Sequence, residues 1–450
     1  MENIVLVVPP GLPGTTPNRE AASGMGSVSP EPRGFFYPPH TVATMAAVLR
    51  AAGRHVIVQD AVARNYDTMR CLREILAAKP SLVGMFVSYS THEEDTLFLT
   101  ALRRELPRAV PVVCFGVATP FIAEDLAMAD HLLLGEPELS FLALADRLLR
   151  REDQLPHQVA PDVLGVEGYD HWGMIKDLDA LPMPAWDLLP TAQYSFLSIL
   201  SSRGCPGRCT WCPYVVVQGR RFRACSPERV LAELRHVVRQ HHPHRIVFRD
   251  PVFAHDRERV VRICQGILED RVLRHGRALL WECESRPEHF DGELLRLMNL
   301  AGCISIKVGL ETTNPDVLVR QGRVASYEEV ESYLAHVRQL VNDCSRLGIM
   351  CRLFVLAGLP GQTVTAARMT ARFIDAIKPD AISVNTLRDY PGLRLHRQPW
   401  AEETYTQWEV LFRAQMVLAQ TGTGRRPSRL WPTERFLLRA TAPLRHNKRG

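Results

Sequence analysis

The chain has 450 residues, of which 46% are hydrophobic and 23% charged, and its formal net charge is +5. This length exceeds one ordinary hydrophobic core, so we expect two or three domains, and the dispersed charge argues against nucleic-acid binding. No secretory signal and no apolar run of the roughly 20 residues that span a membrane are visible, so we expect a cytoplasmic protein without a transmembrane segment.

Residues 1–153 alternate short apolar runs with helical patterns, which is typical of βαβ units. The predicted strands are residues 4–8, 55–59, 82–88, 110–115 and 131–134. Helices are expected between them, for example at residues 41–52 and 93–105. This alternation predicts an α/β fold whose first domain is an open, doubly wound, Rossmann-like parallel sheet.

Four loops follow strands of this predicted sheet, at the edge where doubly wound sheets bind ligands. They carry small, hydroxyl-bearing and acidic residues, which allow close backbone approach and hydrogen bonds to a polar cofactor. The candidate binding residues are Pro10, Tyr89, Ser90, Thr91, Gly116, Thr119, Gly135 and Glu136. Any one loop has a plain alternative as a turn, but four loops at one edge favour a ligand site.

Regular periodicity fades over residues 154–193, which we interpret as a linker. A second βα series follows, with predicted strands at residues 196–200, 245–248, 279–283, 304–308, 352–356 and 381–385. It predicts a partial (βα)6 barrel over residues 194–395 with its active site at the carboxyl ends of the strands.

Residues 396–450 are expected to be helical and then irregular, ending in a basic tail. Residues 425–449 contain eight Lys or Arg and a single acid, Glu434. We interpret this tail as a solvated end, with an anionic partner or peripheral association with a membrane surface as the alternative.

Three cysteines, Cys205, Cys209 and Cys212, follow the first barrel strand within eight residues. In a chain without an export signal, clustered cysteines indicate metal ligands rather than disulfides. A structural zinc requires a fourth ligand, for which Cys225 or a histidine at 241 or 242 is the nearest candidate. An iron–sulfur cluster on three thiolates leaves one iron open. The spacing favours the cluster, with zinc and a redox thiol group as alternatives.

This Cys-x3-Cys-x2-Cys spacing, with Trp211 before the last cysteine, resembles the signature of the radical S-adenosylmethionine (SAM) superfamily. Segments at later strand ends also resemble that family in the expected order, and they contain Asp250, Glu284, Arg286 and Glu311. The first domain resembles the cobalamin-binding domain that precedes the barrel in one branch of these enzymes, through residues 39–53, 80–84, 112–116 and 135–138. Together the two resemblances cover residues 1–395.

The resemblance implies that the three cysteines bind a [4Fe-4S] cluster whose open iron takes SAM. It implies SAM contacts from Asp250, Glu284, Arg286 and Glu311, each of which has an alternative role in an ion pair at the barrel mouth. It implies cobalamin contacts from the eight loop residues given above. The chain lacks Asp-x-His-x-x-Gly, and His171 lies in the linker, so we expect no histidine lower ligand to cobalt.

The leading interpretation is a cobalamin-dependent radical SAM C-methyltransferase that acts on an unactivated carbon of a biosynthetic intermediate. A cobalamin-dependent radical SAM cyclase or rearrangement enzyme is the second interpretation, and a non-catalytic metal-binding protein is the third. The expected partners are a small-molecule or lipid-like substrate and a reducing electron donor such as a flavodoxin or ferredoxin. No sequence pattern identifies the substrate.

Overall fold

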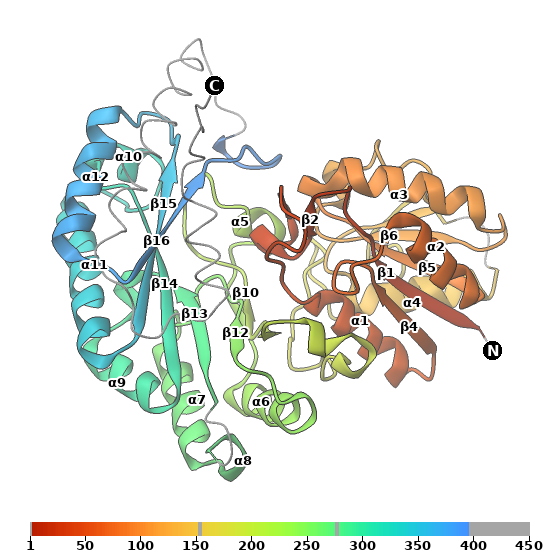
Figure 1. Cartoon of the computed structure of the whole chain (residues 1–450), viewed down its shortest axis with the longest axis horizontal. Coiled ribbons are helices and arrows are strands. Elements are labelled where there is room, and N and C mark those ends of the chain that lie inside the picture. Colours follow the sequence, from red (N-terminus) through yellow and green to blue (C-terminus); the bar gives the residue numbers. More distant parts are fainter. Residues whose placement is uncertain (1, 152–154, 275–278, 396–450) are drawn as a thin grey trace, which may run out of the picture.

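The computed structural model describes residues 2–151, 155–274 and 279–395. Two lobes lie side by side, one formed by the N-terminal residues and the other by the C-terminal part of the described chain (Figure 1). The predicted C-terminal region and its basic tail, residues 396–450, lie outside the described residues.

The N-terminal lobe contains a six-stranded parallel sheet in the order β4-β1-β5-β6-β7-β8. Its strands are β1 (Asn3–Val8), β4 (His55–Asp60), β5 (Pro80–Phe86), β6 (Val112–Phe115), β7 (His131–Leu133) and β8 (Gln158–Val159). The first five confirm the predicted strands, whereas β8 lies in the segment interpreted as a linker. The order reverses between β1 and β5, which creates the topological switch point where such sheets bind ligands.

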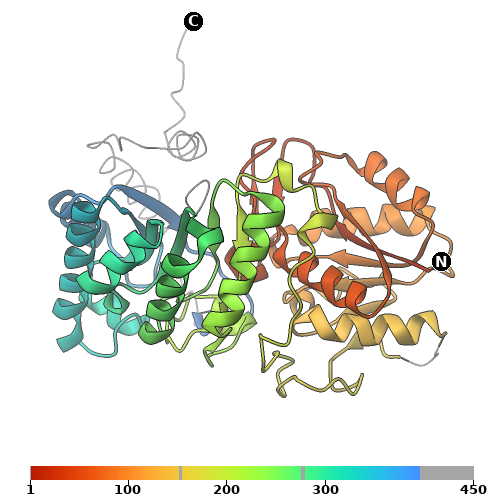
Figure 2. The same ribbon diagram turned by 90° about the horizontal axis from the view of Figure 1, so that it is seen from below.

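Helices cover both faces of this sheet. Successive residues of a strand point to opposite faces, so each strand packs against both helical layers. They are α1 (His40–Ala51), α2 (Thr68–Ala77), α3 (His92–Glu105) and α4 (Pro137–Leu149). Ile4 and Leu6 of β1 pack in the core with α1 and α4, whereas Val5 and Val7 pack with α2 and α3. The doubly wound fold is therefore confirmed, and Figure 2 shows the helical layers from below.

The C-terminal lobe contains a second six-stranded parallel sheet, in the order β16-β15-β14-β13-β12-β9. Its strands are β9 (Leu197–Ile199), β12 (Ile246–Phe248), β13 (Trp281–Ser285), β14 (Cys303–Glu311), β15 (Met350–Ala357) and β16 (Ala381–Thr386). The strands follow one another across the sheet in the same order as along the chain, as they do in a barrel. The six predicted strands and the partial barrel are confirmed.

One face of the second sheet is covered by helices. They are α6 (Pro227–His241), α7 (Arg257–Glu269), α9 (Gly292–Leu300), α11 (Glu328–Leu347) and α12 (Val364–Ile377). Trp281 and Cys283 of β13 pack into the hydrophobic core on this face. The alternate residues Glu282 and Glu284 face the other side, so the inner face of the partial barrel is polar.

Shorter elements complete the described chain. They are β2 (Thr16–Asn18), β3 (Ser27–Ser29), β10 (Ser202–Arg203), β11 (Arg223–Ala224), α5 (Tyr214–Val217), α8 (Arg271–Arg274), α10 (Pro315–Arg320), and the 3-10 helices η1 (Ala21–Gly24), η2 (Tyr89–Thr91), η3 (Thr119–Phe121), η4 (Trp186–Leu188), η5 (Thr191–Gln193) and η6 (Pro287–His289). The pairs β2–β3 and β10–β11 are antiparallel.

The segment between the lobes packs tightly onto both. Trp186 is fully buried in a hydrophobic core that includes residues of α1 and of α6. The Ala185 N–H donates a 2.9 Å hydrogen bond to the carbonyl of Ala43 in α1. This shared core fixes the relative position of the two sheets.

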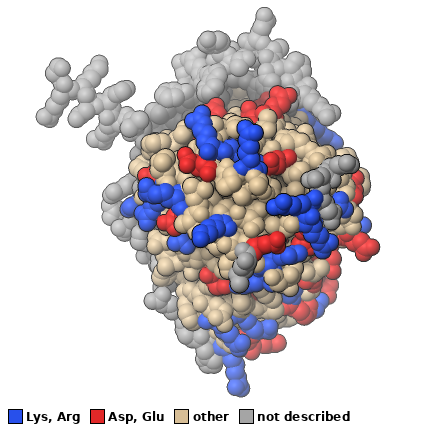
Figure 3. All heavy atoms as spheres, turned by 90° about the vertical axis from the view of Figure 1, so that its right-hand side faces the viewer, with Lys and Arg blue, Asp and Glu red and all other residues tan. Residues whose placement is uncertain are grey.

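The surface carries charges of both signs. On the face shown in Figure 3, Lys and Arg side chains are interspersed with Asp and Glu. No helix in the described parts of the chain is long and apolar enough to cross a membrane.

Candidate functional site

The three cysteines lie on a loop between β10 and α5. Gly204 begins this loop with φ +81°, and a side chain there would collide with the backbone across from it. The Cys205 N–H donates to the carbonyl of Gly219 at 3.1 Å, and the Thr210 N–H donates to the carbonyl of Gln321 at 3.0 Å. Two separate segments therefore hold the cysteine loop in place.

The thiols of this loop are shielded from water. Cys209 is 7% exposed, and Cys205 and Cys212 are half-buried. Burial raises the pKa of the Cys205 and Cys212 thiols, although the Gly207 N–H donates to Cys205 Sγ at 3.4 Å and partly offsets this effect. Metal binding must therefore displace protons from the thiols, as thiolate ligation requires.

The surroundings of the cysteine loop disfavour a zinc site. Cys225, the nearest candidate for a fourth ligand, is buried beside Glu233 and Arg229 instead. Within the described ranges, no group of three or more His, Cys, Asp or Glu side chains is already placed to hold a metal ion, and this holds for the three cysteines as well. Three thiols without a fourth protein ligand are the donor set that suits an iron–sulfur cluster with one open iron.

Glu311 ends β14 close to the cysteine loop in a strained conformation. Its φ of +61° is in the left-handed region, which is costly for a residue with a side chain. Its carboxylate lies over Gly309, whose carbonyl accepts a 2.6 Å hydrogen bond from Arg323 Nη2. Burial raises the pKa of Glu311 to about 7, although Arg323 opposes the shift. The site thus contains a buried acid that titrates near neutral pH.

Glu284 and Arg286 lie at the end of β13. Arg286 donates from Nη2 to the carbonyl of Arg323 at 2.8 Å and pairs with Glu288. Lys307 Nζ lies 4.0 Å from the carboxylate of Glu284, whose pKa is raised by burial. Both predicted residues therefore share the barrel mouth with Glu311, and their contact with SAM stays a prediction.

Asp250 lies behind the cysteine loop. Its carboxylate accepts hydrogen bonds from the N–H and hydroxyl of Ser201, at 2.8 and 2.6 Å, and from the hydroxyl of Ser202 at 2.7 Å. Because both oxygens are engaged, Asp250 fixes the chain just before the cysteine loop. Its predicted contact with SAM is untested, and this geometry favours a positioning role.

At the edge of the first sheet, several predicted binding residues hold the loops themselves together. The Thr119 hydroxyl lies 2.8 and 2.9 Å from two backbone carbonyls and shares its one hydrogen between them, and the Thr91 hydroxyl donates to Asp95 at 2.6 Å. Gly116 and Gly135 have φ of +140° and +77°, and backbone atoms fill the space of a side chain. These residues shape the edge, and their contact with cobalamin stays a prediction.

The loop after β5 contacts the C-terminal lobe. The ring of Tyr89 packs edge-on against Tyr390, with ring centres 5.9 Å apart. The Ser90 hydroxyl accepts a 3.3 Å hydrogen bond from Arg388. Tyr390 thus belongs to the boundary between the lobes.

The remaining predicted residue of this edge, Pro10, is buried at the end of β1.

The carboxyl edges of the two sheets meet in an apolar layer. From the first lobe it contains Met25 and Ala118, and from the cysteine loop it contains Cys209 and Trp211. Other members are Val217, Val317, Leu356, Leu359, Tyr390, Leu393 and Leu395. This layer brings the cysteine loop into contact with the ligand-binding edge of the doubly wound sheet.

A buried ion-pair network also joins the lobes. Glu136 pairs with Arg223 at 2.8 Å and with Arg203 at 3.2 Å, while Glu138 pairs with Arg203 at 2.6 Å. All four side chains are at most 5% exposed. Burial opposes ionisation of Glu136, but the two arginines hold its pKa below the ordinary value.

Glu136 is predicted to contact cobalamin, but its ionic partners Arg203 and Arg223 are not predicted from the sequence. One signal was available: Arg203 directly precedes Gly204 and the cysteine motif. The pairing itself is not readable from sequence, because Arg203 and Arg223 lie 67 and 87 residues from Glu136.

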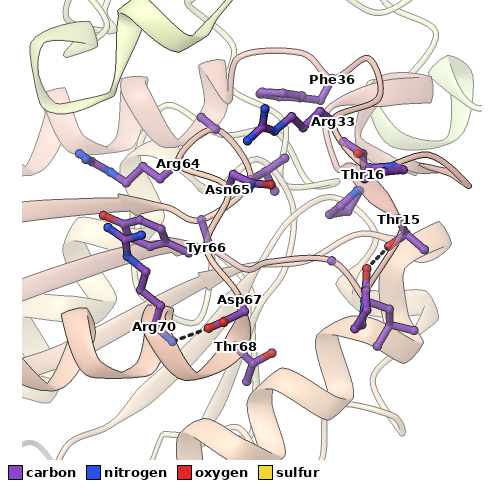
Figure 4. Close-up of a pocket in the computed structure, with 18 of the residues that line it drawn as sticks. Thr15, Thr16, Arg33, Phe36, Arg64, Asn65, Tyr66, Asp67, Thr68 and Arg70 are labelled. Atoms are coloured by element: carbon purple, nitrogen blue, oxygen red, sulfur yellow. Dashed lines mark hydrogen bonds between the residues drawn. The ribbon is translucent and has the colours of Figure 1, made fainter.

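A cavity of about 1240 Å³ lies at the ends of β1 and β4, and none of the three cysteines lines it. Figure 4 shows Arg33, Arg64, Tyr66 and Arg70 around it. All its lining residues belong to the first lobe or to the segment between the lobes, so its size does not identify the centre of the chemistry. A smaller cavity of about 50 Å³ lies between the lobes, next to the ion-pair network.

No histidine lines either of these two cavities in the described part of the chain. His171 is exposed, and its ring centre lies 4.8 Å from that of Trp172. The expectation that cobalt has no histidine lower ligand stays a prediction.

Residues 199–374 match the family model of the Radical SAM superfamily. An uncharacterized methyltransferase of Pyrococcus horikoshii is 24% identical over 377 residues, which cover 80% of this chain and 77% of that protein. The hopanoid C-2 methylase of Rhodopseudomonas palustris is 26% identical over 221 residues, 48% of this chain and 40% of the methylase.

Similarity also extends to a solved structure. The radical SAM methyltransferase TsrM from Kitasatospora setae, with cobalamin and a [4Fe-4S] cluster bound, superposes with a TM-score of 0.66 and 21% identity. The superposition covers 87% of this chain and 77% of TsrM. At this identity the comparison shows a shared fold, in which a doubly wound lobe precedes a partial barrel.

Proposed function

We propose that this protein, whose residues 199–374 form a radical SAM domain, is a cobalamin-dependent radical SAM C-methyltransferase. Its substrate would be a small biosynthetic intermediate that is methylated at an unactivated carbon. The observation that carries the proposal is the contact between the cysteine loop and the carboxyl edge of the doubly wound sheet. A cofactor bound on the cysteine loop and a cofactor bound at the edge of the doubly wound sheet would then lie next to each other.

The radical SAM domain implies a [4Fe-4S] cluster and SAM as cofactors, and Cys205, Cys209 and Cys212 are the residues that would hold the cluster. When bound, the cluster and SAM supply a carbon-centred radical and cobalamin supplies a methyl group. Glu311 would accept a hydrogen bond from SAM, and Arg286 would contact its polar groups. The apolar layer around Cys209 would exclude water from the reacting groups.

Two observations support cobalamin as the second cofactor. The chain shares its fold with TsrM, whose structure contains cobalamin and a [4Fe-4S] cluster. A small cavity of about 50 Å³ also lies between the lobes, and its lining includes Gly116 and Glu136, two of the residues predicted to contact cobalamin.

The relatives support methyl transfer as the reaction. The hopanoid methylase and TsrM are both methyltransferases, but this chain spans only 40% of the hopanoid methylase. The substrate class therefore stays open between small polar molecules and lipid-like ones. A low-potential electron donor, such as a flavodoxin or ferredoxin, would supply the electrons.

The test is label transfer from methyl-labelled SAM. The anaerobically reconstituted protein, given reductant, cobalamin and extract metabolites, should release 5′-deoxyadenosine and form a labelled organic product. Release of 5′-deoxyadenosine without transferred label would favour the cyclase or rearrangement alternative. Failure of both reactions in protein with a full cluster would contradict the radical-enzyme proposal.

A further inference from the structure

The segment that carries the cysteines is basic on its outer side. Residues 204–222 connect β10 to β11, which pair as antiparallel strands. They contain three arginines, Arg208, Arg220 and Arg221, and neither Asp nor Glu. These three arginines are exposed, whereas Arg203 and Arg223 in the two strands are buried in the ion-pair network. The exposed side of the segment therefore carries positive charge without an acid of its own.

Guanidinium groups surround Gly207, which lies in the middle of the cysteine motif. Arg208 is the next residue, and Arg220 Nη1 donates to the Gly207 carbonyl at 2.7 Å. Arg286 Nη1 lies 3.5 Å from the position that a Cβ atom of Gly207 would occupy. Glu288 pairs with Arg286 and offsets its charge. The charge of Arg208 and Arg220 is not offset in this way by any ion pair within the described ranges.

One of the cysteines comes close to solvent at this surface. Cys205 is half-buried, and Pro206 next to it is exposed. The Cys205 N–H donates to the carbonyl of Gly219 at 3.1 Å, so the stretch of chain that continues into Arg220 and Arg221 runs beside this cysteine. A protein that contacts these arginines would therefore lie next to a predicted cluster ligand.

We propose that Arg208, Arg220 and Arg221 form the docking surface for an acidic electron-carrier protein. Flavodoxins and ferredoxins have the complementary chemistry, since both are small proteins with many surface carboxylates. Arginine pairs with carboxylates through a planar fork of donors, which suits it to protein interfaces. Electron-transfer contacts are small and depend on complementary charge, so a few arginines are enough to orient the carrier.

This proposal rests on the proposed function, because it places the protein that would supply electrons to the cluster. In the docked pair, one electron leaves the reduced carrier, which is thereby oxidised by one electron. The same electron enters the cluster, which is reduced by one, and no bond forms between the two proteins. A small chemical reductant such as dithionite supplies the electron without the docking surface, so docking and catalysis can be tested separately.

The experiment compares the reconstituted full chain with Arg208→Gln/Arg221→Gln, which removes two positive charges. Arg220 is kept, because it holds the Gly207 carbonyl. The probes are an oxidised flavodoxin and an oxidised ferredoxin, and the association rate constant of each is measured at low and high salt. At low salt we expect association to be about tenfold slower in the variant. At high salt the difference should disappear, because exposed charges are screened.

Cluster reduction, followed by the change in absorbance, gives a second comparison. Reduction by either reduced carrier should slow by the same factor as association, whereas reduction by dithionite should change less than about twofold. The matched control, Arg73→Gln/Arg104→Gln, removes the same charge from exposed positions of α2 and α3 in the first lobe (Figure 1) and should match the wild type. Thermal midpoints and iron contents report whether each variant keeps its fold and its cluster.

The proposal is overturned if the wild type binds neither carrier, or if folded Arg208→Gln/Arg221→Gln associates with both as fast as the wild type at low salt. Equal slowing in the control would also overturn it, because net charge rather than this surface would then attract the carrier. A wild-type chain with a full cluster that releases no 5′-deoxyadenosine with dithionite would instead contradict the proposed function. The two failures are distinguishable because dithionite bypasses the docking surface.

Discussion

The two sheets use their carboxyl edges differently. At the second sheet, Glu284, Glu311 and the three thiols present side chains toward the barrel mouth. At the first sheet, the hydroxyls of Thr91 and Thr119 are engaged within their own loops. The second edge thus offers reactive groups, whereas the first offers a shaped surface.

This difference follows from what each cofactor requires of a protein. A metal cluster needs ligand atoms, which only side chains such as thiolates supply. A large planar cofactor needs a matching surface, which Gly116 and Gly135 help to form because each lets a backbone carbonyl, of Val87 and of Gly173, pack where a side chain would be. Substitutions at the two edges should therefore change different properties of the protein.

Loss of a cluster ligand should have the largest effect. Cys209→Ala is expected to lower iron from ~4 per chain to near zero, since two thiolates do not hold the cluster. Iron analysis and electron paramagnetic resonance after anaerobic reconstitution measure this. Cys225→Ala removes a buried cysteine away from the loop and should keep its iron. Loss of iron in Cys225→Ala would contradict a cluster held by three cysteines, because it would make Cys225 a further ligand.

Breaking the ion-pair network should rank second, because it leaves buried charges unpaired. Glu136→Ala is expected to lower the free energy of unfolding by about 3–5 kcal/mol. Denaturant unfolding of the metal-free chain checks this value. Asp187→Ala breaks an exposed pair with Arg50 and should cost about 1 kcal/mol or less. Equal costs for both variants would contradict the coupling of the lobes by buried charge.

Glu311 should make the metal-free protein less stable as the pH rises. Its pKa is about 7, against an ordinary value of 4.5. The free energy of unfolding is therefore highest below pH 4.5 and falls as the pH rises through 7, where Glu311 becomes charged in the folded state. The loss is about 3 kcal/mol at roughly 1.4 kcal/mol per unit. Glu311→Gln should thus be more stable than the wild type at pH 8 and equal to it near pH 4.

Unfolding curves at several pH values measure the difference between Glu311→Gln and the wild type. Glu293→Gln, at an exposed carboxylate, is the control and should show no such pH-dependent gain. A parallel pH dependence in wild type and Glu311→Gln would contradict the assignment of the raised pKa.

The smallest effect is expected at the edge of the first sheet. Thr119→Val keeps the shape but leaves two carbonyls without the hydroxyl, so the free energy of unfolding should fall by about 1–2 kcal/mol. Ser90→Ala, at a half-buried hydroxyl, should change it by no more than about 0.5 kcal/mol. A loss of cobalamin binding without any loss of stability in Thr119→Val would mean that its hydroxyl serves the ligand.

The fold was largely predictable, because buried parallel strands are nearly continuous apolar runs. β8 was not predicted, because it consists of only Gln158 and Val159, which are too few residues to show a periodic pattern. The cysteine loop was predictable from its spacing. The roles of Glu136 and Asp250 were not, because their partners come from distant segments that only the fold brings together.

A cluster that adjoins cobalamin is central to the proposed function. The direct measurement is iron, cobalt and zinc content, with an ultraviolet–visible spectrum, of the full chain purified anaerobically with added hydroxocobalamin. We expect ~4 irons per chain, stoichiometric cobalt and a corrin absorption band. Stoichiometric zinc, with neither iron nor a corrin band, would contradict it.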